Sequence, residues 1–198
     1  MGKTPPRPGL ENAAWVTIPN KLSVQELKSF CESVENLFRL NPYLKIKSWQ
    51  TKDSHNAHVR WENHSSHHVF LVDTDISVDS NHQEIKIEYK NGPKKQTLLI
   101  VNAVSRGSEL IIIDDYGENT HKSYAEIDKS LNAWGESLKQ FFNHYAVIKY
   151  VPFVRLLINK VWIRMNPMAR RITYILFVIT TVELIALLLF VIAMLLKS

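Results

Sequence analysis

Residues 84–104, EIKIEYKNGPKKQTLLIVNAV, decide the fold of this chain. Ile85, Ile87 and Tyr89 alternate with charged residues, which is the period of a strand with one buried face. Asn91-Gly92-Pro93 is typical of a tight turn, and a second apolar run follows it. The stretch therefore predicts a β-hairpin.

The same period of two continues on both sides of this hairpin, with turn residues about every ten positions. A short strand is expected before it, over residues 14–18. Consecutive hairpins form an antiparallel meander with one buried and one solvated face. The strands predicted for the meander are residues 44–50, 57–62, 68–78, 84–90, 96–104 and 109–116.

Two helices are predicted beside the meander. Ser23 and Glu26 have capping-box spacing and predict a helix over residues 23–40, which carries Cys31 on its apolar face. Ser123 and Glu126 have the same spacing before a second helix, over 123–145. The second helix should lie on the sheet, with Gly135 at a point of close packing. Its apolar stripe consists of Ile127, Leu131, Trp134, Leu138 and Phe141.

Residues 172–196, ITYILFVITTVELIALLLFVIAMLL, contain one formal charge, Glu183. About 20 apolar residues in helix cross a hydrocarbon core of about 30 Å. We therefore expect a single transmembrane helix that acts as a tail anchor. The alternative is a buried core helix of a soluble domain, but core helices seldom have an apolar surface on all sides.

The net charge of +5 is confined to one part of the chain. Residues 1–148 carry 17 Lys and Arg against 18 Asp and Glu, whereas residues 149–171 carry six basic residues and no acid. Such a cluster beside a span fits anionic lipid headgroups better than nucleic acid. Because basic flanks stay on the cytoplasmic side, we expect a single-pass membrane protein with a cytoplasmic N-terminal domain and no nucleic-acid partner.

Residues 149–171 are expected to include a basic amphipathic helix, over 153–165, that lies in the membrane interface. The alternative is a helix docked on the domain. The residues expected at the membrane surface are Arg155, Lys160, Trp162, Arg164, Arg170 and Arg171.

Within the span, Thr180 and Glu183 share one helix face. An ionisable group inside a bilayer is costly, so these residues are predicted to contact a membrane-protein partner. The alternative is a Glu183 that a single-pass helix tolerates in its protonated form.

The order strand, helix, six-strand meander and long helix, over residues 14–148, resembles the helix-grip fold of the START and polyketide-cyclase-like superfamily. Asn41-Pro42, Asp114-Asp115-Tyr116 and Trp134 add to this resemblance. It implies an α+β domain in which a curved antiparallel sheet of about seven strands is wrapped on a long C-terminal helix. The sheet and the helix enclose a cavity that commonly takes an apolar ligand. A flexible leader, residues 1–13, would precede this domain.

The resemblance and the alternation predict which side chains line such a cavity. Its polar contacts are expected to come from Tyr89, Asn102 and Thr74, since each stands in register with the alternate apolar residues of its strand. The alternative is a solid core. The full expected lining is Phe70, Val72, Thr74, Ile76, Ile85, Ile87, Tyr89, Asn102, Trp134, Leu138 and Phe141.

The chain has no nucleophile elbow, Walker loop, dinucleotide fingerprint or zinc spacing. No catalytic residue and no cofactor are therefore assigned, and an enzyme is the less expected class. The paired acids Asp73 and Asp75, and Asp114 and Asp115, have no partner that the sequence places. Cys31 is expected to be an inert core thiol.

The three histidines of the NHSSHH run, His64, His67 and His68, are expected to lie in a solvated turn rather than to bind a metal, which needs three or four converging ligands.

Two functions from different classes remain. The first is a membrane-anchored binding module that holds or transfers a hydrophobic ligand, such as a lipid or quinone, at the cytoplasmic face. The second is a non-catalytic accessory subunit of a larger membrane complex, which docks through the transmembrane and juxtamembrane helices. They differ in whether the cavity is open.

Overall fold

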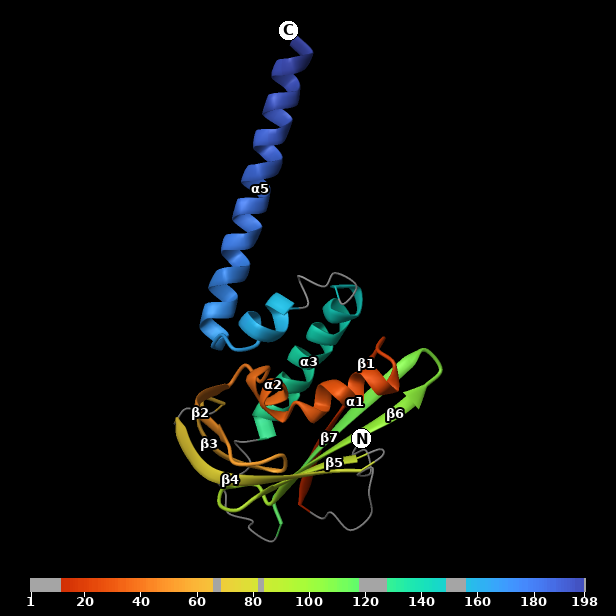
Figure 1. The fold of residues 1–198 in the computed structure, drawn as a ribbon, viewed down its shortest axis with the longest axis vertical. Helices are drawn as coiled ribbons and strands as arrows, with labels where there is room; N and C mark the ends of the chain where they lie inside the picture. Colours follow the sequence, from red (N-terminus) through yellow and green to blue (C-terminus); the bar gives the residue numbers. More distant parts are fainter. Residues whose placement is uncertain (1–11, 66–68, 82–83, 118–127, 149–155, 198) are drawn as a thin grey trace. The chain divides into compact units, whose positions relative to one another are not determined.

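The computed structural model describes residues 12–65, 69–81, 84–117, 128–148 and 156–197 (Figure 1). The chain divides into two compact units, Met1–Arg164 and Met165–Ser198, and each is described by itself. The second unit contains α5 (Pro167–Lys197). The elements of the first unit are β1 (Ala13–Asn20), α1 (Val24–Glu32), α2 (Val34–Arg39), β2 (Leu44–Thr51), β3 (Asn56–Asn63), β4 (Phe70–Ser80), β5 (Glu84–Tyr89), β6 (Gln96–Val104), β7 (Gly107–Asp115), α3 (Asp128–Ile148) and the π-helical turn η2 (Ile158–Trp162).

Strands β1 to β7 belong to one antiparallel sheet with the order β1-β7-β6-β5-β4-β3-β2. Strands β2 to β6 each pair with the next strand along the chain, and β1 lies beside β7 with Val16 opposite Ile112. The register of β2 on β3 shifts between Ile46 and Ser48, an irregularity of the kind that bends a sheet. Figure 1 shows the bent sheet with α1, α2 and α3 on one side of it. The predicted meander and first strand are confirmed.

The side of the sheet that faces the helices forms the main apolar core. Ile85 and Ile87 of β5 are buried in it, and Tyr89 packs against it, as the alternation predicts. Glu88, between two of these residues, is exposed. Cys31 of α1 is fully buried in the same core. The period of two thus places β5 correctly.

The buried stripe of α3 differs from the prediction by one position. Phe142 is fully buried, whereas the predicted Phe141 is half-buried at the edge of the core. Ser123 and Ile127, the predicted cap and first stripe residue, lie outside the described residues. The stripe consists of Leu131, Trp134, Leu138 and Phe142.

Gly135 marks the closest approach of α3 to the sheet. A Cβ atom added at Gly135 would lie 2.7 Å from Cγ2 of Val16 in β1, which is too short for a van der Waals contact. A residue without a side chain is therefore required for α3 to lie this close to β1. The close packing predicted at Gly135 is confirmed.

The single helix predicted over residues 23–40 is wrong, because the chain forms α1 and α2 instead. The capping box is present: the N–H of Ser23 donates to Glu26 Oε2 at 3.0 Å, and the N–H of Glu26 donates to Ser23 Oγ at 3.3 Å. The helix breaks at Ser33, whose ψ of 71° is not helical. Helix α1 contacts β6 and β7 whereas α2 contacts β2, so the break lets the two helices follow a bent sheet.

The expectation of one solvated face is wrong for the β1-β7-β6 part of the sheet. Ile112 faces the main core, while Ile111 and Ile113 point to the other face and are also buried. They pack with Leu98 and Trp15 in a second apolar cluster. The continuous apolar run of β7 is the pattern of a strand that is buried on both faces.

The described part of the predicted juxtamembrane helix begins at residue 156 and includes η2. Its apolar residues do not share one face as predicted. Ile158 packs against the core of the first unit and Ile163 is fully buried in it, whereas Leu157 and Val161 are exposed. The π-helical turn changes the residue spacing from that of an α-helix, which explains the difference.

Helix α5 includes the predicted span. Among the described residues, one helix is long and apolar enough by length and composition to cross a membrane: Pro167–Leu196, with a mean hydropathy of 2.9. Its start is capped by Asn166, whose Oδ1 accepts the N–H of Ala169 at 2.7 Å. None of the described side chains of α5 is buried.

Candidate functional site

A pocket lies between the first unit's helices α2 and α3 and the strands β2 to β5. Its volume is about 30 Å³. The lining residues are Phe38, Asn41, Leu44, Trp61, Asn63, Val72, Tyr89, Asn91, Gly92, Pro93, Lys94, Ser130 and Trp134.

Four aromatic side chains from four different elements form the apolar wall of the pocket. Phe38 of α2 lies between Trp61 of β3 and Trp134 of α3, with ring centroids 5.8 and 5.4 Å apart, and the Trp61 and Tyr89 rings are 6.4 Å apart. These are edge and tilted contacts, which aromatic rings favour. The indole N–H of Trp134 donates to the carbonyl of Leu37 at 3.0 Å, so the ring is held in place.

A buried polar network borders the same pocket. Asp114 of β7 is fully buried, and its Oδ2 forms an ion pair and hydrogen bond with the ammonium group of Lys94. The hydroxyl of Thr97 donates to Asp114 Oδ1 at 2.5 Å. A buried carboxylate is tolerated only when it is paired and hydrogen-bonded, and Asp114 satisfies both conditions.

Tyr89 joins this network to the pocket. Its hydroxyl lies 2.9 Å from Thr97 Oγ1. Because Thr97 has a single hydroxyl proton and donates it to Asp114, the hydroxyl of Tyr89 must be the donor to Thr97. Burial, together with the charge of Asp114, raises the pKa of Tyr89 well above its ordinary value, so the hydroxyl keeps the proton that it donates.

The pocket therefore offers an apolar wall and two polar groups. Lys94 Nζ can donate hydrogen bonds beyond the one to Asp114, and the oxygen of Tyr89 can accept one. Such a site can hold an apolar group with a polar atom attached to it. Tyr89 stays protonated, which makes it a poor nucleophile.

Of the residues predicted to line a cavity, Val72, Tyr89 and Trp134 line this pocket. The others occupy different surroundings, and a contact of any of them with a ligand stays a prediction. Thr74, Ile76, Ile85, Ile87 and Leu138 are buried in the core, while Phe70, Asn102 and Phe141 are half-buried.

Two predicted polar contacts are used within the protein. The amide of Asn102 donates to Glu109 Oε1 at 3.2 Å, across the β6–β7 hairpin. The hydroxyl oxygen of Thr74 accepts the N–H of Asn91 at 3.0 Å. Neither side chain lines the pocket.

Sequence reasoning missed Lys94 and Thr97 as partners of Asp114. One signal was available: Asp114 follows Leu110 and Ile112 at intervals of two, so it must point into the core. A carboxylate in that position requires a cation or a donor nearby. The hairpin alone does not show that Lys94, in the turn before β6, supplies it.

Comparison with known proteins places the fold. No family model and no curated protein matches the chain. A hypothetical protein from Sulfolobus tokodaii matches with a TM-score of 0.50 at 12% identity, over 70% of this chain and 96% of that chain. The domain has the helix-grip fold. At this identity the likeness concerns the fold alone.

Two further solved structures are similar at lower TM-scores. A START superfamily protein from Mycobacterium smegmatis gives 0.47 at 12% identity, over 66% of this chain and 94% of that one. The di-domain ARO/CYC StfQ from the steffimycin biosynthetic pathway gives 0.48 at 8% identity, over 68% of this chain and 51% of that one.

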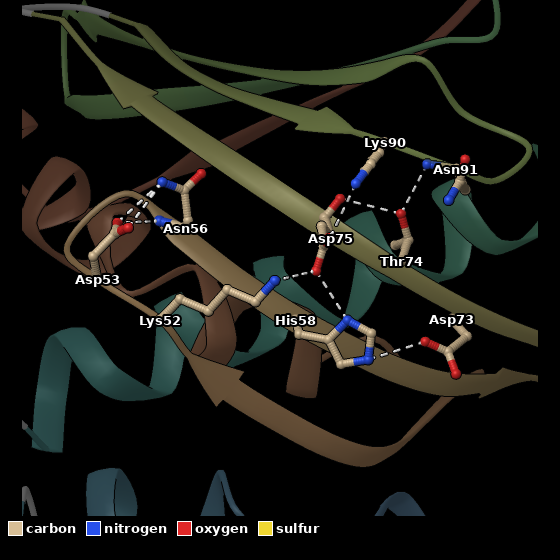
Figure 2. Close-up of polar contacts among 9 residues, drawn as sticks. All are labelled: Lys52, Asp53, Asn56, His58, Asp73, Thr74, Asp75, Lys90 and Asn91. Carbon is tan, nitrogen blue, oxygen red and sulfur yellow. Dashed lines mark hydrogen bonds and ion pairs between the residues drawn. The ribbon is translucent and has the colours of Figure 1, made fainter.

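The helix-grip domain carries a second polar cluster on the opposite face of its sheet (Figure 2). His58 of β3 lies between two carboxylates of β4, with Nε2 3.1 Å from Asp73 Oδ1 and Nδ1 3.0 Å from Asp75 Oδ1. Lys52 Nζ lies 2.8 Å from Asp75 Oδ1, and Lys90 Nζ lies 3.7 Å from Oδ2. The partners of Asp73 and Asp75 that the sequence could not place are therefore cross-strand neighbours.

The hydrogen bond from Lys52, followed by that from His58, lowers the pKa of Asp75 to about 2. In the β2–β3 turn, the side-chain amide of Asn56 donates to both carboxylate oxygens of Asp53, at 3.1 and 3.0 Å. These hydrogen bonds lower the pKa of Asp53. These contacts tie β4 to β3 and to the β2–β3 turn on the solvated face of the sheet.

Among the described residues, no group of three or more His, Cys, Asp and Glu side chains is arranged to hold a metal ion. His64 contacts Glu62 at 3.3 Å, and His67 and His68 lie outside the described residues. Burial raises the pKa of Cys31 to about 12, so its thiol is unreactive at neutral pH, as predicted.

The residues predicted at the membrane surface and in the span lie outside the pocket. Lys160, Arg164 and Arg171 are exposed, whereas Trp162 and Arg170 are half-buried. Arg155 lies outside the described residues. In α5, Thr180 and Glu183 are exposed, and their contact with a membrane-protein partner stays a prediction.

Proposed function

We propose that this protein is a membrane-tethered helix-grip module that holds a hydrophobic group in the pocket beneath α3. The observation that supports the proposal is the pocket itself, with an aromatic wall and the Lys94 and Tyr89 polar atoms beside it. Ligand sites are concave and mostly apolar, with a few placed polar groups that fix orientation. The START-like fold also suggests hydrophobic-ligand binding.

The turn between β5 and β6 is the part that must move to admit a larger ligand. A volume of about 30 Å³ holds only one or two water molecules, whereas ligand pockets usually measure about 300–1,000 Å³. Gly92 and Pro93 of this turn line the pocket, and Lys94 fastens it to buried Asp114. The N–H of Asn91 fastens the other side of the turn to Thr74.

Helix α5 supplies the tether in this proposal. Its apolar stretch of 30 residues, at 1.5 Å per residue, is about 45 Å long and exceeds the hydrocarbon thickness of about 30 Å. Six basic residues lie within positions 149–171, and two of them, Arg170 and Arg171, belong to the start of α5. Their positive charge supports a cytoplasmic location for the domain in this proposal.

Extraction of the purified full chain tests the ligand. A hydrophobic molecule should be recovered in stoichiometric amount after solvent extraction and mass spectrometry. Val72→Phe, which fills the pocket, should abolish the recovery. Leu71→Phe is the matched control, since Leu71 is the next residue of β4 and is exposed. Unchanged recovery from Val72→Phe would refute the pocket as the ligand site, provided that both variants keep the wild-type melting transition.

A second function is favoured by the small volume of the pocket. If the interior is closed, with Trp134 filling it, the protein is a non-catalytic accessory subunit that docks on a membrane complex through α5 and the preceding segment. Thr180 and Glu183 would then contact the partner. This function predicts an empty domain on extraction, and a co-purifying membrane protein that Glu183→Leu releases. Retention of the same partner by Glu183→Leu would contradict that contact.

A further inference from the structure

Residues 156–164 are anchored to the helix-grip domain by two isoleucines. Ile163 is fully buried in the domain core, and Ile158 packs against the same core. The N–H of Ile163 donates to the carbonyl of Ile158 at 3.0 Å, and this five-residue spacing puts both side chains on one side of the turn. The guanidinium of Arg39 in α2 also donates to the carbonyl of Arg164, at 3.5 Å. The segment therefore belongs to the folded domain.

The opposite side of the same segment is apolar and basic. Leu156, Leu157 and Val161 are 51%, 41% and 44% exposed. Lys160 and Arg164 are exposed among them. We call these five residues the docking face. Large apolar side chains that gather in the open on one short segment indicate a contact surface.

We propose that the docking face rests on the surface of an anionic bilayer. Exposed leucine and valine beside lysine and arginine is the composition of segments that lie in the lipid interface, with the apolar groups below the headgroups and the cations among them. The segment 149–171 contains no acidic residue that would repel anionic lipid. The chain also continues from Arg164 into the apolar α5 within three residues. A bilayer fits these observations better than a protein partner does.

This inference goes beyond the tether. A span alone leaves a domain free to turn on its linker, whereas a docking face that is part of the domain holds the domain in one orientation on the membrane. The docking face belongs to the unit Met1–Arg164, so it acts whether or not the pocket takes a ligand.

A spin label at Val161→Cys in the full chain, reconstituted in vesicles, tests the inference. Native Cys31 needs no replacement, because it is buried and the pKa of its thiol is raised to about 12, so the label reacts at residue 161. Asp79→Cys, on an exposed position of β4, is the matched control. The label's relaxation by a water-soluble nickel chelate is measured in phosphatidylcholine vesicles with and without phosphatidylglycerol.

In anionic vesicles, the label at 161 should lose most of its relaxation by nickel while the label at 79 keeps it. In neutral vesicles, the loss at 161 should be much smaller. Equal accessibility of the two labels in anionic vesicles would overturn the proposal. Equal shielding of 161 in both kinds of vesicle would also overturn it, and a dependence on protein density would then assign the shielding to a second copy of the chain.

A pair of double variants isolates the role of charge. Lys160→Gln with Arg164→Gln should remove the difference between anionic and neutral vesicles at label 161, whereas Lys160→Arg with Arg164→Lys should keep it. An identical difference in both double variants would refute the electrostatic part. The label at 79 is the control for nickel access to an exposed site of the domain. Solvent extraction of a ligand does not enter these readouts, so an empty pocket would disprove the proposed ligand without changing the label result.

Discussion

Helices α3 and α5 are 21 and 31 residues long, and their apolar residues are distributed differently around the helix axis. In α3, one stripe of side chains is buried against the sheet and the other side is polar, as at Asn132 and Glu136. In α5, the apolar residues lie on all sides and none of the described side chains is buried.

The difference shows what each helix needs from its surroundings. A helix with a single apolar stripe is satisfied by a protein core, which in α3 includes the close contact of Gly135 with Val16. A helix that is apolar on all sides is long enough here, by length and composition, to cross a bilayer, which is the environment proposed for α5.

Replacing the central residue of the α3 stripe should have the largest effect on the stability of the domain. Trp134→Ala removes a fully buried indole and its hydrogen bond to Leu37, so the free energy of unfolding should fall by about 3–5 kcal/mol. Denaturant titration of the full chain in detergent measures it. Asn132→Ala, on the exposed side of α3, should change stability by less than about 0.5 kcal/mol. Equal effects would mean that α3 does not pack as described.

Breaking the buried ion pair should cost about 3 kcal/mol. Lys94→Met leaves the carboxylate of Asp114 buried without its cation, which is more costly than losing both charges. The double variant Lys94→Met with Asp114→Leu should therefore recover most of the stability. Chemical denaturation of both variants measures the difference, and a double variant no more stable than Lys94→Met would show that the pair is not buried.

Adding a methyl group where α3 meets β1 should cost about 1–2 kcal/mol. Gly135→Ala brings a Cβ atom to 2.7 Å from Val16, and this overpacking outweighs the better helix propensity of alanine. In a Val16→Ala background, where the two nearest atoms are gone, Gly135→Ala should be neutral or stabilising. A double-mutant cycle in thermal unfolding measures the coupling, and strict additivity would contradict the close contact.

The smallest effect is expected on the solvated face of the sheet, and it should depend on pH. The pKa of Asp75 is lowered to about 2 from an ordinary 3.8, so its contribution is present above about pH 4 and is lost as the pH falls toward 2. In Asp75→Asn, the free energy of unfolding should therefore fall less between about pH 4 and pH 2 than it does in the wild-type chain. Asp79→Asn removes the same charge from the same strand and is the control. Equal pH profiles for the two variants would count against the Lys52 and His58 contacts.

The strands, the helix with one apolar stripe and the helix that is apolar on all sides could be predicted from sequence, because they follow from the local spacing of apolar residues. Alternation at Ile85, Ile87 and Tyr89 fixed the inward face of β5, and the capping box at Ser23 fixed the start of α1. The break at Ser33 could not be foreseen. It depends on the bend of the sheet beneath the helices, which no local pattern of residues encodes.

The candidate site was less predictable because it depends on contacts between distant residues. The pairing of Lys94 with Asp114 spans two strands and a turn, and the size of the pocket depends on how Phe38 and Trp134 meet. The alternation of residues along a strand shows that a side chain points inward. It does not show whether the space ahead of that side chain is open or filled.

Alkaline extraction of vesicles that carry the full chain tests most directly the claim that α5 spans a bilayer. The wild-type chain should stay with the lipid pellet after the wash. The variant with Leu187→Arg and Leu188→Arg should be released, because each arginine near the middle of a span costs about 2.5–3.5 kcal/mol on insertion scales. Release of the wild-type chain into the supernatant would contradict the membrane tether.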